Sequence, residues 1–113
     1  MATYDAPLHI EAFENMEASR KTVYTLPATL DYRFMVSGDR LEFGSFGSIT
    51  VGMVRRYESL EALVEAQGWE CLVPEAEDAD SAIKIVRAND DWDDGAESEH
   101  GVLALRVREA RRK

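Results

Sequence analysis

The hydrophobic period of the sequence changes twice, and this limits the folds that are open to the chain. Residues 21–26, 41–43 and 49–54 alternate in the manner of half-buried strands and are rich in β-branched, aromatic and aliphatic side chains. In the last of these, Ile49, Val51 and Met53 are expected to point inward. Between residues 59 and 89 the apolar residues recur at helical spacing, and residues 102–107 alternate again. The pattern predicts an α+β protein, with a small curled sheet or β-barrel and two or three helices.

The helical region has recognisable ends. Ser59 is a suitable N-cap for "LEALVEAQ", and Gly68 follows its apolar stripe. A second helix is expected within "PEAEDADSAIKIVRAN". Near the start, "PLHIEAF" suggests a short strand or extended entry, followed by a helical turn over "EAFENMEAS". The segment "DDWDDGAESE" is expected to be a polar connection.

Length and composition indicate one domain spanning residues 1–113, with a solvated basic tail at 108–113. No window has the roughly 20 apolar residues of a membrane helix, and the first residues lack the pattern of a secretory signal. Cys71 is the single cysteine, which excludes an internal disulfide. These features predict a cytoplasmic protein without a membrane partner.

The charge is distributed unevenly along this acidic chain, whose formal net charge is −9. Residues 65–100 contain twelve acidic and two basic residues, whereas residues 18–44 contain three acidic and four basic ones. The acidic segment is a candidate surface for a protein partner, and an exposed Trp69 or Trp92 would favour that role. The mildly basic strip around Arg20-Lys21-Thr22 is the candidate surface for an anionic ligand.

Metal and cofactor sites are not expected. The acidic run "NDDWDDG" places Trp92 where a calcium loop needs an oxygen ligand. His9 and His100 lack a third ligand at the spacing of a zinc site. Glycine-rich phosphate loops, dinucleotide fingerprints and serine-nucleophile elbows are absent from the sequence. The sequence therefore predicts no cofactor and no resident metal.

Four motifs in order resemble the ASCH family, whose members are small β-barrels similar to PUA domains. They are the helix "EAFENMEAS" running into Ser19-Arg20-Lys21-Thr22, then Gly38-Asp39 before "RLEF", then "ITVGMVRRYESLEALVEA", and finally "GVLALRV". The resemblance spans roughly residues 8–107. It implies an RNA- or nucleotide-binding domain that recognises single-stranded RNA or a nucleoside near the Arg-Lys-Thr motif.

The sequence departs from the family pattern at positions that matter for catalysis. The first glycine of the motif is replaced by Ser19, and "VYTLP" places Tyr24 and Leu26 where the family has a Glu or Thr and then an Arg. Family members that hydrolyse acylated cytidine are proposed to use the Lys, that Thr and a Glu after the first long helix. Lys21 matches this set, Tyr24 replaces the Thr, and Glu65 or Glu70 is nearest to the Glu.

The predicted binding site is a cleft bordered by exposed cations. Lys21 is expected to reach into the cleft and Arg20 to line its edge, because adjacent residues of a strand diverge. The other predicted binding residues are Thr22, Arg33, Arg40 and Arg56. Weaker catalytic candidates are Lys21, Tyr24 and Glu70. Two alternatives remain open: a small ASCH-type hydrolase, either a metal-dependent ribonuclease or an acylated-cytidine amidohydrolase, or a protein-interaction module.

Overall fold

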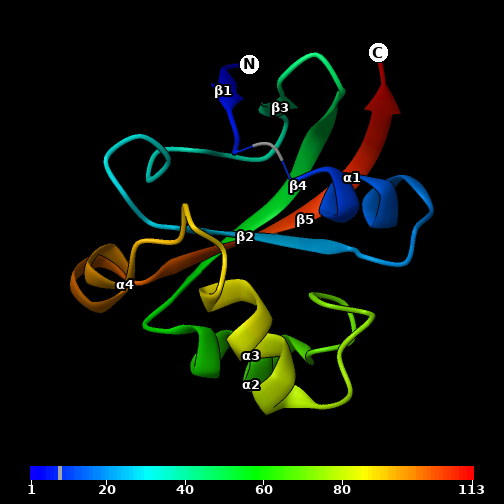
Figure 1. Ribbon diagram of the computed structural model, residues 1–113. Helices are drawn as coiled ribbons and strands as arrows, with labels where there is room; N and C mark the ends of the chain where they lie inside the picture. The colour runs from blue at the N-terminus through cyan, green and yellow to red at the C-terminus, as the bar shows by residue number, and fades with distance from the viewer. Residues whose placement is uncertain (8) are drawn as a thin grey trace.

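A five-stranded sheet and four helices make up the described chain. The computed structural model describes residues 1–7 and 9–113. Over these residues the elements are, in order, β1 (Thr3–Asp5), α1 (Ile10–Glu17), β2 (Val23–Pro27), β3 (Arg40–Phe43), β4 (Gly47–Tyr57), α2 (Leu60–Gln67), α3 (Ala79–Arg87), α4 (Asp94–His100) and β5 (Val102–Arg112) (Figure 1). The strand order is β1-β3-β4-β5-β2; β1 and β3 are parallel, and the other neighbours are antiparallel. The predicted α+β class with a small curled sheet is confirmed.

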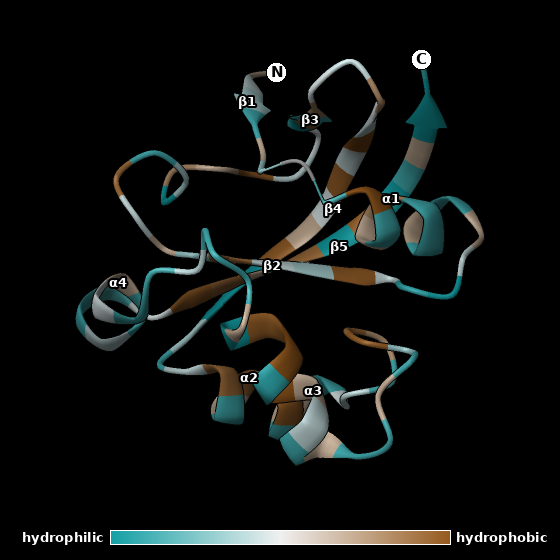
Figure 2. Ribbon diagram, viewed as in Figure 1, coloured by the Kyte–Doolittle hydropathy of each residue, from teal (hydrophilic) through white to brown (hydrophobic). Residues whose placement is uncertain are grey.

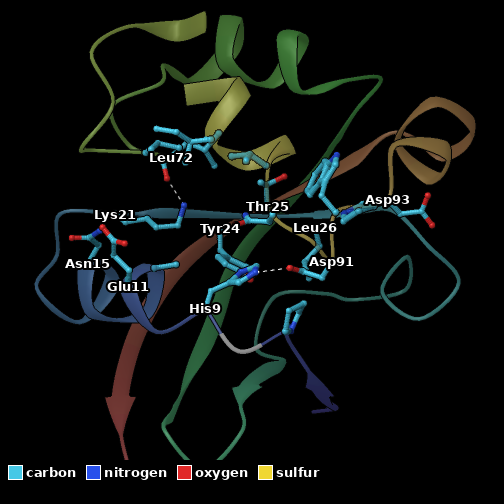
Figure 3. Close-up of a pocket in the computed structure, with 18 of the residues that line it drawn as sticks. His9, Glu11, Asn15, Lys21, Tyr24, Thr25, Leu26, Leu72, Asp91 and Asp93 are labelled. Carbon is cyan, nitrogen blue, oxygen red and sulfur yellow. Dashed lines mark hydrogen bonds and ion pairs between the residues drawn. The ribbon is translucent and has the colours of Figure 1, made fainter. Parts of the chain in front are cut away.

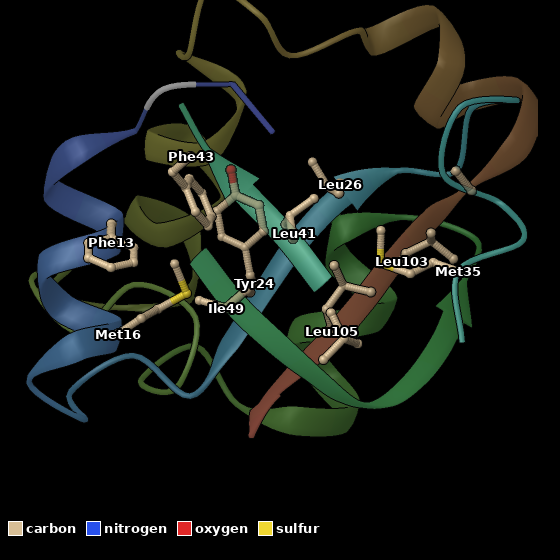
Figure 4. Close-up of a cluster of buried hydrophobic side chains, with 12 residues drawn as sticks. Phe13, Met16, Tyr24, Leu26, Met35, Leu41, Phe43, Ile49, Leu103 and Leu105 are labelled. Carbon is tan, nitrogen blue, oxygen red and sulfur yellow. The ribbon is translucent and has the colours of Figure 1, made fainter. Parts of the chain in front are cut away.

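The helices cover the two faces of the sheet with separate cores. Phe13 and Met16 of α1 pack on one face, in a cluster with aromatic and aliphatic side chains of β2 to β5 (Figure 4). The buried side chains of α2 and α3 pack on the other face against Val23, Val102 and Ala104. Figure 2 shows hydrophobic residues along the central strands and on α2 and α3. Because both faces are covered, all five residues of β2 are buried.

The pairing of β4 with β5 is interrupted, which changes the direction of one predicted core residue. The register shifts between Thr50 and Val51 and again between Val51 and Val54. A β-bulge adds a residue to one strand and so changes which side chains face the core. Met53, expected to point inward with Ile49 and Val51, is instead 55% exposed.

The acidic segment before the last strand contains a helix, not the predicted polar connection. The Asp93 carboxylate caps α4 by accepting a hydrogen bond from the backbone N–H of Ala96, at 3.0 Å. The helix ends at Gly101, where φ is +83° and an added Cβ would lie 2.3 Å from the Tyr57 carbonyl oxygen. The hydrophobic pattern gave no sign of this helix, because its buried residues are a small one, Ala96, and an acidic one, Glu97.

The two ends of the chain also differ from expectation. β5 continues to Arg112, so most of the predicted solvated tail is strand; Arg112 pairs with Glu17, and Lys113 with Glu42. The extended entry predicted for residues 7–13 includes Leu8, which lies outside the described residues; from Ile10 onward the segment is helical. No helix in the described part of the chain is long and apolar enough to span a bilayer.

Candidate functional site

A pocket of about 410 Å³ lies between α1, β2, the loop after β2, and the segments before and after α3. We call it the Lys21 pocket, because Lys21 lines it. The apolar part of the wall includes Leu26, Leu72 and Val86, and the polar part includes His9, Asn15, Lys21, Tyr24, Glu75 and Asp91 (Figure 3). The size and mixed lining are those of a small-molecule site.

Lys21 is buried in this pocket, although the sequence predicted an exposed lysine at a cleft rim. The chain turns sharply after α1 through Ser19, whose φ is +63°, and the backbone N–H of Lys21 bonds to the carbonyl of Asn15. This turn brings the side chain under the segment before α3, where its ammonium donates to the Leu72 carbonyl. Lys21 is 7% exposed, and its Nζ lies 5.6 Å from the centroid of the Tyr24 ring.

Burial changes the acidity of the Lys21 ammonium. Loss of hydration lowers its pKa to about 8, while the negative charge of Glu75 opposes this change. Glu75 is held at the pocket by Asn15, whose Nδ2 donates to Glu75 Oε2 at 3.0 Å. The pocket thus contains an amine that is partly neutral near physiological pH and a carboxylate whose charge acts on it.

A second group of hydrogen-bonded side chains joins the wall formed by β2 to the segment after α3. His9 Nδ1 lies 2.9 Å from the Tyr24 hydroxyl, and His9 Nε2 lies 2.8 Å from Asp91 Oδ1 (Figure 3). Tyr24 is 3% exposed, and its ring packs edge-on against Phe43. Burial, with a smaller effect of the Asp91 charge, raises the pKa of Tyr24, so the phenol stays protonated.

The structure brings together only two of the predicted site residues, Lys21 and Tyr24. The other predicted residues lie outside the described pocket lining and are exposed; they are Arg20, Thr22, Arg33, Arg40, Arg56 and Glu70. The Arg56 guanidinium binds the carbonyl of His100 at the end of α4, and Arg33 lies over the ring of Phe34. The cleft bordered by several cations is therefore not formed.

Sequence reasoning missed most of the polar pocket residues. From the sequence, His9 is considered only as a possible metal ligand, and the glutamate candidates, Glu65 and Glu70, are outside the pocket lining, which includes Glu75. Thr25 also lines the pocket, one position after Tyr24, and its hydroxyl donates to the Leu103 carbonyl at 2.9 Å. Glu75 lies in the loop between α2 and α3, and hydrophobic period gives no signal for a polar loop residue of this kind.

The lining of the Lys21 pocket is acidic. Five carboxylates contribute to it, from Glu11, Asp31, Glu75, Asp91 and Asp93, against the single ammonium of Lys21. Among residues 1–7 and 9–113, no three His, Cys, Asp or Glu side chains are grouped so that they could hold a metal ion. The acidic segment predicted as a partner surface contributes three of the pocket carboxylates and the buried Glu97.

Comparison with known proteins establishes the fold. No family model matches the chain, and no curated protein sequence matches it. The crystal structure of the hypothetical protein PH0355 is similar with a TM-score of 0.83 and 24% identity, over 97% of this chain and 99% of that chain. The solution NMR structure of protein PF0455 from Pyrococcus furiosus is similar with a TM-score of 0.75 and 23% identity, over 96% of each chain. The arrangement of sheet and helices is therefore shared with these proteins over nearly their whole length.

Proposed function

We propose that this chain binds a nucleoside in the Lys21 pocket. The observation that carries the proposal is a buried amine, with hydrogen-bonding side chains around it, in a pocket of about 410 Å³. Ligand pockets typically combine such a volume with an apolar wall and a few convergent polar groups. The resemblance to the ASCH family supports the same assignment, because Lys21 occupies the lysine of its Arg-Lys-Thr motif.

The charge of the pocket favours a nucleoside over the phosphate backbone of RNA. Five carboxylates line it, and the predicted arginines lie elsewhere on the surface. A phosphate in this pocket would be repelled by most of the charges around it. A neutral base and ribose can instead use the apolar wall and exchange hydrogen bonds with the polar groups.

Isothermal titration calorimetry tests this proposal. Cytidine and adenosine should bind, their monophosphates should bind more weakly, and the affinity of the nucleosides should change little with salt. A ligand held through phosphates would lose affinity steeply as salt is added. Lys21→Met should weaken nucleoside binding, while Lys84→Met, at an exposed position on α3, should leave it unchanged. Binding of single-stranded RNA but of no nucleoside would overturn the proposal.

A second candidate function is hydrolysis of an acyl amide on the exocyclic amine of the bound base. The observation that favours it is the buried Lys21 amine, whose pKa is lowered to about 8, in a pocket that Glu75 also lines. The neutral Lys21 amine would take a proton from water as the water oxygen bonds to the acyl carbon. The bond from that carbon to the exocyclic nitrogen would then break, and this nitrogen would receive the proton, giving a free amine and a carboxylic acid.

Chromatography of N4-acetylcytidine incubated with the protein tests this candidate. Free cytidine and acetate should appear in equal amounts, and the rate should rise with pH up to about 8 and then level off, as the amine loses its proton. Glu75→Gln should move the rise of the rate to lower pH, because the charge of Glu75 raises the pKa of Lys21, whereas Glu77→Gln, at an exposed position outside the pocket lining, should not. Tight binding without any turnover would leave the nucleoside-binding function alone.

A further inference from the structure

The hydrogen-bonded series Asp91–His9–Tyr24 fixes the position of each proton within it. An ionised carboxylate can only accept hydrogen bonds, so His9 Nε2, 2.8 Å from Asp91 Oδ1, must carry the hydrogen between them. In a neutral imidazole the other nitrogen then has no hydrogen and is an acceptor. With the imidazole in this neutral form, His9 Nδ1 accepts the hydrogen bond from the Tyr24 hydroxyl, over 2.9 Å.

This arrangement leaves Tyr24 with an oxygen that can only accept. A phenol has one O–H, and His9 uses it, so the remaining lone pairs of the oxygen have no hydrogen to offer a ligand. Among the described residues no other donor bonds to this oxygen. Burial raises the pKa of Tyr24, so the phenol keeps its hydrogen and continues to donate it to His9. Tyr24 also lines the Lys21 pocket.

We infer that Tyr24 selects ligands that place an N–H donor against its oxygen, and that the preferred nucleosides are those with an exocyclic amino group. His9 and Asp91 are positioning residues, since they act on the ligand through Tyr24. This inference rests on the proposed function and adds to it the group of the ligand that the pocket recognises.

The energetic reason lies in what happens to a ligand without that donor. An apolar edge would leave the lone pairs of the buried Tyr24 oxygen without a donor, although its O–H still bonds to His9, and a carbonyl would place two acceptors against each other. Sites built to form a hydrogen bond discriminate strongly against analogues that cannot form it. An acylated exocyclic amine keeps one N–H, so an amide substrate satisfies the same requirement.

Calorimetry with paired nucleosides tests the inference. The probes are cytidine and adenosine, each beside its deamino analogue, pyrimidin-2-one riboside and purine riboside, at pH 7.5. The protein should bind the amino compound about tenfold more tightly within each pair. Tyr24→Phe keeps the buried ring and removes the acceptor, so it should abolish the preference while binding of the deamino compounds changes little.

The positioning role has its own variant and its own readout. Asp91→Asn lets the new amide donate to His9 Nε2, so the imidazole hydrogen can move to Nδ1; the preference should fall several-fold. Asp90→Asn, at the neighbouring exposed residue outside the pocket lining, should keep it. Long-range ¹H–¹⁵N NMR of the free protein should show the hydrogen of His9 on Nε2, and in Asp91→Asn on Nδ1 in part.

The outcomes separate this inference from the proposed function. Nucleoside binding with equal affinity for both members of each pair, or a preference that survives Tyr24→Phe, would overturn the inference and leave nucleoside binding in place. A hydrogen on His9 Nδ1 in the free protein would also overturn it. Absence of binding by all four nucleosides would reject both.

Discussion

Lys21 and Glu97 are both buried charged residues, but their surroundings differ. Glu97 is 5% exposed, and its carboxylate accepts hydrogen bonds from the Leu60 backbone at 3.0 Å, from the Arg87 guanidinium at 2.6 and 3.1 Å, and from the Trp92 indole at 3.1 Å. Lys21 is 7% exposed and has one acceptor, the carbonyl of Leu72. One charge is surrounded by partners, and the other has a single partner and faces a pocket.

The pKa changes of the two groups reflect this difference. Burial alone would raise the pKa of the Glu97 carboxyl, but the bonds from Arg87, Leu60 and Trp92 outweigh it and lower the pKa. Burial lowers the pKa of Lys21, and the Glu75 charge only partly offsets it. A buried charge with all its partners stabilises a structure, whereas one with few partners is available for a ligand or a proton transfer.

The largest expected effect is the loss of the Glu97 carboxylate. Glu97→Ala should lower the free energy of unfolding by about 3 kcal/mol, because it leaves the Leu60 backbone N–H and the Trp92 indole N–H without their acceptor and removes the buried one of the two carboxylates that pair with the half-buried Arg87 guanidinium. Urea unfolding followed by circular dichroism measures this change. Glu61→Ala is the matched control: Glu61 also pairs with Arg87, but its side chain is 57% exposed, so the loss should stay below about 1 kcal/mol. Equal losses would remove the distinction between the buried cluster and an ordinary surface pair.

The next effect is a pH dependence that arises from Lys21. The folded protein releases this proton near pH 8, and the unfolded chain near its ordinary value of 10.5. Between these pH values the unfolded state binds more protons, so the free energy of unfolding should rise with pH through this window. The full change is about 3 kcal/mol for a shift of this size.

Lys21→Met keeps the apolar stem and removes the titration, so the comparison isolates Lys21. The free energy of unfolding of the original protein minus that of the variant should increase between pH 8 and 10.5. The raised pKa of Tyr24 affects both proteins in the same direction and cancels in the difference. A flat difference would show that the Lys21 amine is hydrated in the folded protein and would weaken the case for proton transfer.

A smaller effect is expected from the indole that completes the Glu97 cluster. Trp92→Phe removes the donor to Glu97 Oε1, which Arg87 Nε still contacts at 3.1 Å, and should cost about 1 kcal/mol. Trp69→Phe provides the control, because Trp69 packs in the same hydrophobic cluster without bonding to Glu97. Chemical denaturation of both variants gives the comparison, and a larger loss for Trp69→Phe would point to packing instead of hydrogen bonding.

The smallest expected effect belongs to an exposed pair. Lys113 Nζ lies 2.8 Å from Glu42 Oε2, with side chains that are 47% and 28% exposed. Lys113→Met should change the free energy of unfolding by less than about 0.5 kcal/mol, and the difference should vanish in concentrated salt. Thermal melts at low and high salt measure this change in stability. A loss near that of Glu97→Ala would show that burial does not determine how much an ion pair contributes to stability.

The fold could be predicted from sequence where hydrophobic period determined the structure. The alternation at residues 49–54 and 102–107 and the capped helical stripe after Ser59 correspond to β4, β5 and α2. α4 could not be predicted in this way, because its buried residues are Ala96 and Glu97, and one small residue beside a paired acid gives little apolar signal. The prediction that Met53 points inward was wrong, because the pairing register of β4 with β5 shifts between Val51 and Val54 and the sequence pattern does not reveal this shift.

The candidate site could be predicted only in part. Lys21 was found through a short motif, and Tyr24 through its place in the same strand. His9, Glu75 and Asp91 come from three separate segments, and it is the packing of α1 and α3 around β2 that brings them to one pocket. The predicted arginines were grouped by their charge in the sequence, whereas in the structure they are spread over exposed positions.

The position of β2 in the sheet has a consequence for protein synthesis. β2 lies at the edge of the sheet, and its strand neighbour is β5, so residues 23–27 pair with residues 102–106. Contacts so distant in sequence form late, because a long loop must close before they stabilise the chain. A nascent chain that has not yet released residues 102–106 from the ribosome therefore has no Lys21 pocket. Until β5 pairs with it, β2 has no strand neighbour on either edge, and a chaperone or another nascent chain can bind it.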